Sequence, residues 1–190
     1  LMGIIGFDSV KKKREWSDTE ESLLRFFCQA LGHVLDRKKA EQILELSEKR
    51  YRTLFETAGD AIFIIDVSQD NIGQIIDANQ KAADMHGYSR DEIIRLNIKD
   101  LDSSNDAIKA SDRIKRIMTG EWINLELNHK RKDGSTFPVE VSAGLIELGD
   151  DRYILAFDRD VSDRKTLESK LSQSQKMESI GNLAGGIAHE

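Results

Sequence analysis

The spacing of apolar residues changes along the chain and separates helical from alternating segments. From Ser17 to about residue 57, apolar residues recur three and four positions apart, which predicts one long helix. Ser17 and Glu20 form a capping box, the sequence signature of a helix start. Before that helix, residues 3–10 (GIIGFDSV) predict a single strand. A long exposed helix of this kind usually finds a partner helix for its apolar residues.

Residues 61–159 follow a different pattern, in which short alternating runs are separated by turns. The runs AIFIIDV and QIIDA predict two strands around a turn at 68–73. Three more strands are predicted where apolar residues alternate with polar ones, at Ile123, Leu125 and Leu127, at Phe137, Val139, Val141, Ala143 and Leu145, and at Tyr153, Leu155 and Phe157. The pair Asp133-Gly134 predicts a tight hairpin between the first two of these. Two strands, then helices, then three strands predict an α+β fold: a five-stranded antiparallel sheet with helices on one side.

Helix signals fill the middle of this segment and return after it. Asn79 can cap a short helix that Gly87 ends, and Ser89 with Glu92 forms a second capping box. Residues 106–119 predict one amphipathic helix that stops at Gly120. From Ser162 the pattern is helical again, so we expect long helices on both sides of the sheet domain.

Composition narrows the function classes. The 190 residues are 39% hydrophobic and 33% charged, which suffices for one core of about 110 residues with charged extensions. The net charge of −6 argues against nonspecific nucleic-acid binding, which needs a cationic surface. The single cysteine, Cys28, excludes a disulfide framework within the chain and favours a reducing, cytoplasmic location. No run of about 18 apolar residues exists, so we expect no membrane span in this segment. A chain that begins with Leu and ends within a motif is expected to be a piece of a longer protein.

Three separated motifs carry a family resemblance. The stretches IIDANQKAADMHGYSRDEI, RKDGSTFPVEVS and ILAFDRDVSDRK resemble a PAS sensor domain, which we place at residues 58–161. The resemblance implies a ligand-sensing or dimerising domain whose sheet encloses a pocket against the helices. It implies structural roles for Asn79, Gly87, Glu92, Lys132 and Gly134. Glu92 and Lys132 are expected to form an ion pair, and the alternative for Glu92 is a capping role alone.

The sequence predicts no tightly bound cofactor and no metal in this domain. Cys28 lies outside it, so the cysteine-adduct flavin chemistry of PAS photosensors is not expected. His86 lies beside Gly87 in a polar turn, and His129 lies near the polar end of a strand. Both histidines are therefore expected at the surface. Met118 is expected to fill a gap in the core rather than to bind haem. A small organic ligand or an empty core are the two expectations for the interior.

The two ends resemble parts of other signalling modules. Residues 1–40 resemble the last strand and helix of a GAF domain, and 41–57 are interpreted as a helical linker. Residues 162–178 are interpreted as a signalling helix. At the junction, Asp160-Val161-Ser162 resembles the Asp-x-Thr exit motif that ties the last PAS strand to the output helix. Here Ser replaces Thr, which removes a methyl group and puts the strength of that coupling in question.

Residues 179–190 begin the last module. The stretch KMESIGNLAGGIAHE resembles the phosphoacceptor box of sensor histidine kinases. On a helix, Ile180, Leu183 and Ile187 share one face and His189 lies opposite, toward water. The resemblance implies that His189 accepts a phosphoryl group and that Glu190 acts as the base that takes its proton.

The sequence thus predicts the sensory region of a two-component sensor histidine kinase. The expected partners are a second copy of the chain, through the helices, and the receiver domain of a response regulator. ATP and Mg²⁺ are expected as cofactors of the full-length kinase. They are not expected to bind to this sequence, because it contains no ATP-binding glycine motif. Two alternatives remain open: a non-enzymatic PAS module that binds a ligand or dimerises to control another output domain, and a PAS sensor of another enzyme, such as a cyclase.

Overall fold

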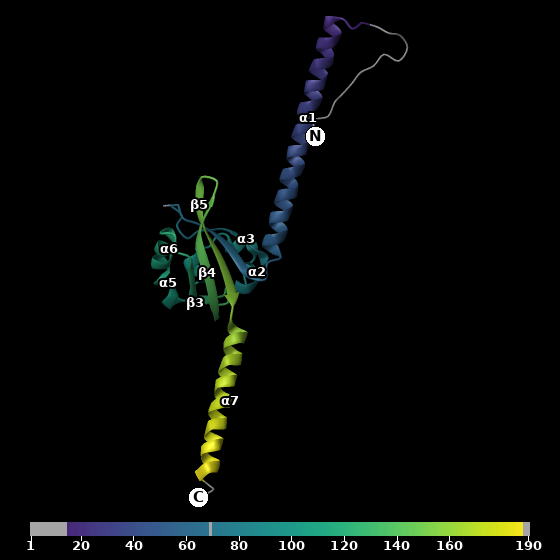
Figure 1. Cartoon of the computed structure of the whole chain (residues 1–190). Coiled ribbons are helices and arrows are strands. Elements are labelled where there is room, and N and C mark those ends of the chain that lie inside the picture. Colours follow the sequence, from purple (N-terminus) through teal and green to yellow (C-terminus); the bar gives the residue numbers. More distant parts are fainter. Residues whose placement is uncertain (1–14, 69, 188–190) are drawn as a thin grey trace. The chain divides into compact units, whose positions relative to one another are not determined.

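The computed structural model describes residues 15–68 and 70–187. In chain order the elements are α1 (Asp18–Glu56), β1 (Ala61–Asp66), β2 (Ile75–Ala78), α2 (Gln80–His86), α3 (Arg90–Ile93), α4 (Ile98–Leu101), α5 (Ser104–Ala107), α6 (Ala110–Met118), β3 (Ile123–Lys130), β4 (Thr136–Leu148), β5 (Asp151–Asp160) and α7 (Ser162–Ile187) (Figure 1). The chain divides into two units, Leu1–Thr53 and Leu54–Glu190. No helix within the described residues is both long and apolar enough to cross a lipid bilayer.

The first unit consists of most of α1. The predicted capping box is present, since the Ser17 amide donates to Glu20 Oε2 at 3.0 Å and the Glu20 amide donates to Ser17 Oγ at 3.4 Å. The helix runs unbroken to Glu56, as the lack of a stop signal predicted. Most of its large apolar side chains, Leu23, Phe27 and Val34 among them, are more than half exposed in the single chain. The strand predicted at residues 3–10 lies outside the described residues.

The second unit is built on a five-stranded antiparallel sheet with strand order β2-β1-β5-β4-β3, which confirms the predicted architecture. The Asp133-Gly134 turn joins β3 to β4, and Gly134 has φ +86°, a conformation that glycine adopts without strain. β5 pairs with β4 over its whole length and with β1 on its other edge. The last strand therefore lies in the centre of the sheet and leads directly into α7.

The core lies between one face of the sheet and the helices α2 to α6 (Figure 1). Alternation along β4 turns Phe137, Val139, Val141 and Ala143 inward, as predicted. In β5 the buried face is the opposite of the one that the sequence predicted. Ile154, Ala156 and Asp158 are buried, while Tyr153, Leu155 and Phe157 are only half-buried on the other face.

The caps of α2 and α3 position the helices at one end of the core. Asn79 is fully buried and caps α2 through its Oδ1, which accepts from the Ala82 amide at 3.0 Å. The same oxygen accepts from the Ile62 amide at 2.9 Å, and Nδ2 donates to the carbonyls of Phe55 and Asp60, each at 3.0 Å. Asn79 thus joins the end of α1, the start of β1 and α2 in one hydrogen-bonded node.

The prediction of one helix at residues 106–119 is wrong, because two separate helices, α5 and α6, occupy this segment. In an unbroken helix the Asp106 carbonyl would accept from the amide of Ala110. Instead it accepts from the Lys109 amide at 3.1 Å and from Arg113 Nη1 at 2.8 Å. The Asp106 side chain also accepts from the Asn128 amide of β3 at 2.9 Å. These tertiary contacts replace the helical ladder at this point.

Candidate functional site

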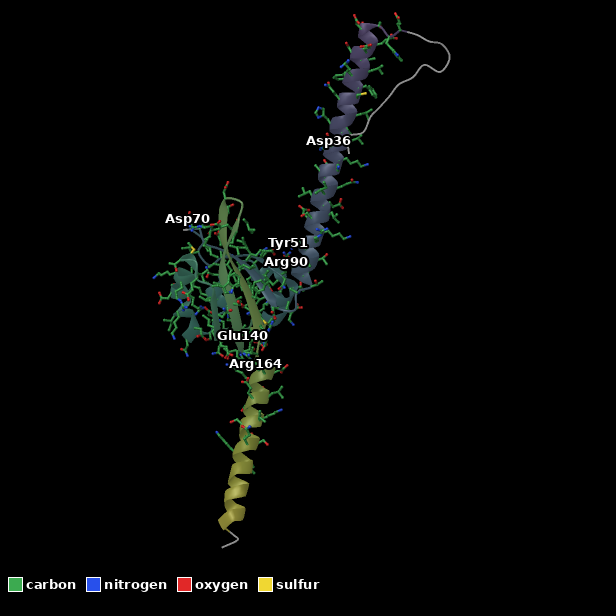
Figure 2. All side chains as sticks on the ribbon, viewed as in Figure 1. Asp36, Tyr51, Asp70, Arg90, Glu140 and Arg164 are labelled. Atoms are coloured by element: carbon green, nitrogen blue, oxygen red, sulfur yellow. The ribbon has the colours of Figure 1, made fainter. Side chains whose placement is uncertain are left out.

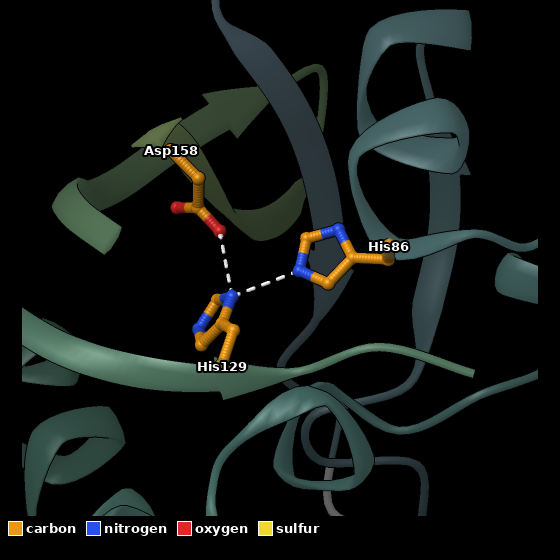
Figure 3. Close-up of side chains that lie close together, drawn as sticks. All are labelled: His86, His129 and Asp158. Carbon is orange, nitrogen blue, oxygen red and sulfur yellow. Dashed lines mark hydrogen bonds and ion pairs between the residues drawn. The ribbon is translucent and has the colours of Figure 1, made fainter. Parts of the chain in front are cut away.

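The interior of the second unit contains a buried polar cluster made of His86, His129 and Asp158 (Figure 3). His86 is the last residue of α2, and His129 and Asp158 come from β3 and β5. Their side chains are at most 1% exposed. The prediction that both histidines lie at the surface is therefore wrong. Each continues an inward face: His86 lies one turn after buried Ala82, and His129 two positions after buried Leu127.

The cluster is connected by short contacts. His86 Nδ1 lies 2.9 Å from the carbonyl oxygen of Ala82, and His86 Nε2 lies 2.9 Å from His129 Nδ1. The same His129 nitrogen is 3.6 Å from Asp158 Oδ2. On the far side of the ring, His129 Nε2 is 3.5 Å from Asp102 Oδ1. Rings of Phe63 and Phe137 pack edge-on against His86 and fix its plane.

The two carboxylates of this region differ in their surroundings. Asp102 pairs with the Arg113 guanidinium of α6, which compensates its charge. Within the described part of the chain, neither carboxylate oxygen of Asp158 has a hydrogen-bond partner. Burial raises the pKa of Asp158 to about 6, because a charged carboxylate loses its hydration there. Burial, followed by the positive potential of His129, lowers the pKa of His86 to about 3, so its imidazole is neutral near pH 7.

A small cavity lies beside the cluster. Its volume is about 50 Å³, and its lining includes His129, Asp158, Asp102 and Arg113 among aliphatic side chains. Pockets that enclose drug-sized ligands have volumes of roughly 300–1,000 Å³. The cavity therefore has room for an ion or a few water-sized groups. Asp158 also lines a larger, open pocket of about 500 Å³ at the surface, so this residue borders both spaces.

A line of contacts leads from the cluster to the start of α7. Phe137 packs against both histidine rings, and the Arg131 guanidinium carbon lies 3.7 Å from the centre of the Phe137 ring. Arg131 donates from Nη1 to the Met85 carbonyl at 2.7 Å and from Nη2 to Asp160 Oδ2 at 3.0 Å. The other Asp160 oxygen accepts from the Ser162 amide, the first residue of α7, at 2.8 Å. Asp160 thus joins the hairpin to the beginning of the helix.

The first turn of α7 is fastened to the sheet by further contacts. Val161 is buried, and its amide donates to the Pro138 carbonyl at 3.1 Å. Glu126 of β3 accepts from Lys165 at 2.6 Å and from Arg164 at 2.7 Å. Figure 2 shows Arg164 next to Glu140 of β4, with a distance of 3.8 Å between the charged atoms. These contacts connect β3 and β4 directly to the first turn of α7.

The sheet domain of the second unit matches one protein family. The family model described as "PAS domain" matches residues 59–163, which is more than half of the chain. The chain belongs to the PAS domain family. A crystal structure of the PAS domain of an HTR-like protein from Haloarcula marismortui superposes with a TM-score of 0.58 and 30% identity, over 65% of this chain and 98% of that one.

Curated relatives of this PAS protein carry different outputs. Sporulation kinase E of Bacillus subtilis is 31% identical over 181 residues, 94% of this chain and 23% of the kinase. Diguanylate cyclase DgcM of Escherichia coli K12 is 28% identical over 133 residues, 70% of this chain and 32% of the cyclase. The chain thus spans about a quarter to a third of the length of these relatives.

The structure brings three of the predicted PAS residues, Glu92, Lys132 and Gly87, close together. Lys132 Nζ lies 2.7 Å from Glu92 Oε1, so the predicted ion pair is present. The pair holds the pKa of Glu92 at about 2, with a further contribution from the Ser89 amide. Because the Lys132 amide donates to the His86 carbonyl at 2.9 Å, this pair lies directly outside the histidine cluster. Gly87 ends α2 with φ +74°.

The structure does not describe every predicted site residue, and several members of the buried cluster were not predicted. His189 and Glu190 lie outside the described residues, and α7 is described to Ile187. Asp158, Asp102 and Arg113 were missed. The available signal for Asp158 was its place in β5, four positions after Ile154 and two after Ala156 on the buried face. Arg131 was also missed, because its role depends on contacts with Phe137 and Asp160 across the sheet.

Proposed function

We propose that this chain is the sensory region of a cytoplasmic sensor histidine kinase, in which the PAS domain controls phosphorylation of His189. The observation that carries the proposal is the continuous line of contacts from the buried histidines through Phe137, Arg131 and Asp160 to the first residue of α7. Its two ends are a cavity that can hold a ligand and a helix that leads toward the acceptor. The kinase relative, which matches 94% of the chain, supports this output.

The hypothesised mechanism is a bias between two arrangements of a helical dimer. A change in the PAS interior shifts the β3–β4 hairpin, and Asp160, Val161 and Ser162 pass that shift to α7. The exposed apolar residues of α1 are consistent with pairing of two copies. We propose that residues 1–40 end a GAF-like domain upstream and that residues 179–190 begin the dimerisation helix.

The proposed chemistry takes place on the His189 imidazole. A ring nitrogen attacks the γ-phosphorus of ATP, a nitrogen–phosphorus bond forms, and ADP leaves with the electrons of the broken bond. Glu190 takes the proton that the ring gives up, following the usual pairing of a nucleophile with a neighbouring base. A catalytic domain beyond this sequence supplies ATP and Mg²⁺, and the phosphoryl group passes on to an aspartate of a receiver domain.

A cyclase output is the second candidate, because a diguanylate cyclase is among the relatives. That match covers 70% of the chain, whereas the kinase match covers 94%. The larger coverage favours the kinase, since the phosphoacceptor-like stretch forms the last twelve residues of the chain.

A hybrid kinase tests the proposal. The chain replaces the matching segment of sporulation kinase E, and the purified protein is incubated with radiolabelled ATP. We expect acid-labile label on the wild-type hybrid, loss of that label in His189→Gln, and normal labelling in His33→Gln, which changes an exposed histidine of α1. Equal labelling of His189→Gln and wild type would overturn the proposal, as would a folded, ATP-binding hybrid that takes up no label.

A further inference from the structure

Two imidazole nitrogens of the histidine cluster, His86 Nε2 and His129 Nδ1, face each other at 2.9 Å. His86 Nδ1 faces the Ala82 carbonyl at 2.9 Å, and a carbonyl only accepts, so this nitrogen carries the proton of the neutral ring. His86 Nε2 is then a lone pair. His129 Nε2 faces the Asp102 carboxylate at 3.5 Å, and that carboxylate is paired with the Arg113 guanidinium. In the tautomer of His129 that donates from Nε2 to Asp102, Nδ1 is a lone pair.

These two lone pairs lie only 2.9 Å apart, and a carboxylate is beside them. Asp158 Oδ2 is 3.6 Å from His129 Nδ1, and among residues 15–68 and 70–187 no group donates a hydrogen bond to either Asp158 oxygen. All three side chains are at most 1% exposed. In these tautomers three buried acceptors converge, and a cation between them, either a proton or a metal ion, satisfies all three.

We propose that His86 Nε2, His129 Nδ1 and the Asp158 carboxylate bind a divalent transition-metal ion, with Zn²⁺ as the best-fitting case. Zn²⁺ binds imidazole nitrogen and carboxylate oxygen at about 2.0–2.2 Å, which places tetrahedral ligand atoms roughly 3.3 Å apart. The two measured separations, 2.9 Å and 3.6 Å, lie on either side of this value. All three ligand atoms lie within 4.8 Å of one another, so shifts of a few tenths of an ångström complete the site.

The outer contacts of the ligands are those of a metal centre. Metal-binding histidines usually donate their other ring N–H to a backbone carbonyl or a carboxylate, which fixes the tautomer and the ring orientation. Ala82 and Asp102 provide one acceptor of each kind. The ion has a route from outside, because Asp158 lines both the interior cavity and the open surface pocket.

Three protein ligands leave a fourth position for water or for a small ligand. This assignment replaces the sequence-based expectation of no metal, which rested on the surface placement of His86 and His129. It concerns binding by the chain itself. Its test therefore succeeds or fails independently of whether the chain controls a kinase.

The test measures metal binding by the full 190-residue chain after removal of metal with a chelator. Titration with ZnCl₂, followed by calorimetry, gives stoichiometry and affinity, and Co²⁺ gives a visible absorption spectrum that reports its ligand geometry. We expect one Zn²⁺ per chain and a Co²⁺ spectrum of low-coordinate type. His33→Gln, the matched control in α1, retains both.

Variants of the ligands decide whether the bound ion occupies the proposed site. We expect His129→Gln and His86→Gln to abolish binding, and Asp158→Asn to weaken it by about tenfold or more, as removal of a charged ligand does. If the histidine variants do not fold, the affinity of Asp158→Asn alone tests the proposed site. This substitution removes an uncompensated charge and keeps the shape of the side chain. Equal affinity of Asp158→Asn and wild type would overturn the proposal. So would a folded wild-type chain that binds neither Zn²⁺ nor Co²⁺, because the cation between the nitrogens is then a proton.

Discussion

Replacement of the buried Asp158 by asparagine is expected to stabilise the metal-free protein. The carboxylate is 1% exposed, and its oxygens have no hydrogen-bond partner within the described residues. Burial raises its pKa from 3.8 to about 6, and about 2 pKa units at 1.36 kcal/mol each correspond to a destabilisation of about 3 kcal/mol above pH 6. A buried amide has its own cost of about 1 kcal/mol or more. The expected net gain for Asp158→Asn is therefore about 1–2 kcal/mol at pH 7.5.

The pH dependence gives this prediction its signature. A carboxyl group whose pKa is raised by folding binds more protons in the folded state, so its destabilising effect is full above pH 6 and disappears as the pH falls toward 3.8. Urea unfolding in the presence of a chelator, at pH 7.5 and at pH 4.5, measures the difference between variant and wild type. We expect the gain at pH 7.5 to shrink markedly at pH 4.5. An Asp158→Asn protein that is less stable than wild type at pH 7.5 would refute the reasoning.

Three further variants test the structural residues of the motifs by the same unfolding assay. Asn79→Ala removes four side-chain hydrogen bonds, three of them buried, and we expect a loss of about 3 kcal/mol or more, against little change for exposed Asn124→Ala. Gly87→Ala forces φ +74° on a residue with a Cβ, so a loss of about 1 kcal/mol is expected, whereas Gly59→Ala, in open space, is tolerated. Glu92→Gln keeps the capping box but removes the charge paired with Lys132. Because folding lowers the pKa of Glu92 to about 2, wild type loses this stabilisation as the pH falls from 4.5 to 2, and the variant has no such loss. Equal unfolding curves for a variant and wild type would contradict the role assigned to that residue.

Local sequence signals predicted most of the fold, because they act over a few residues. The capping boxes at Ser17 and Ser89 and the turn at Gly134 depend on short-range hydrogen bonds and on glycine geometry, and each is present. The break between α5 and α6 could not be read in the same way. It depends on the Asp106 side chain, which binds the Asn128 amide 22 residues away.

The buried cluster was missed for a related reason. Polar side chains next to turns suggested a surface position for His86 and His129, although burial is decided by the face of the element on which a residue lies. In β5 the larger apolar residues, Tyr153 and Phe157, suggested the wrong inward face. A shift of one position along a strand exchanges the two faces, and this error placed Asp158 outside the core.

The link from the PAS interior to the kinase output is the central claim, and the Asp160 junction tests it most directly. In the hybrid kinase, the initial rate of His189 phosphorylation is compared among wild type, Asp160→Asn and Asp163→Asn, the last of which changes an exposed carboxylate in the first turn of α7. Asp160 accepts from Arg131 and from the first amide of α7. Hydrogen bonds to charged groups contribute roughly 1.5–3 kcal/mol, so we predict that Asp160→Asn alters the rate by about fivefold or more while Asp163→Asn leaves it unchanged. Equal rates for all three proteins would contradict the account.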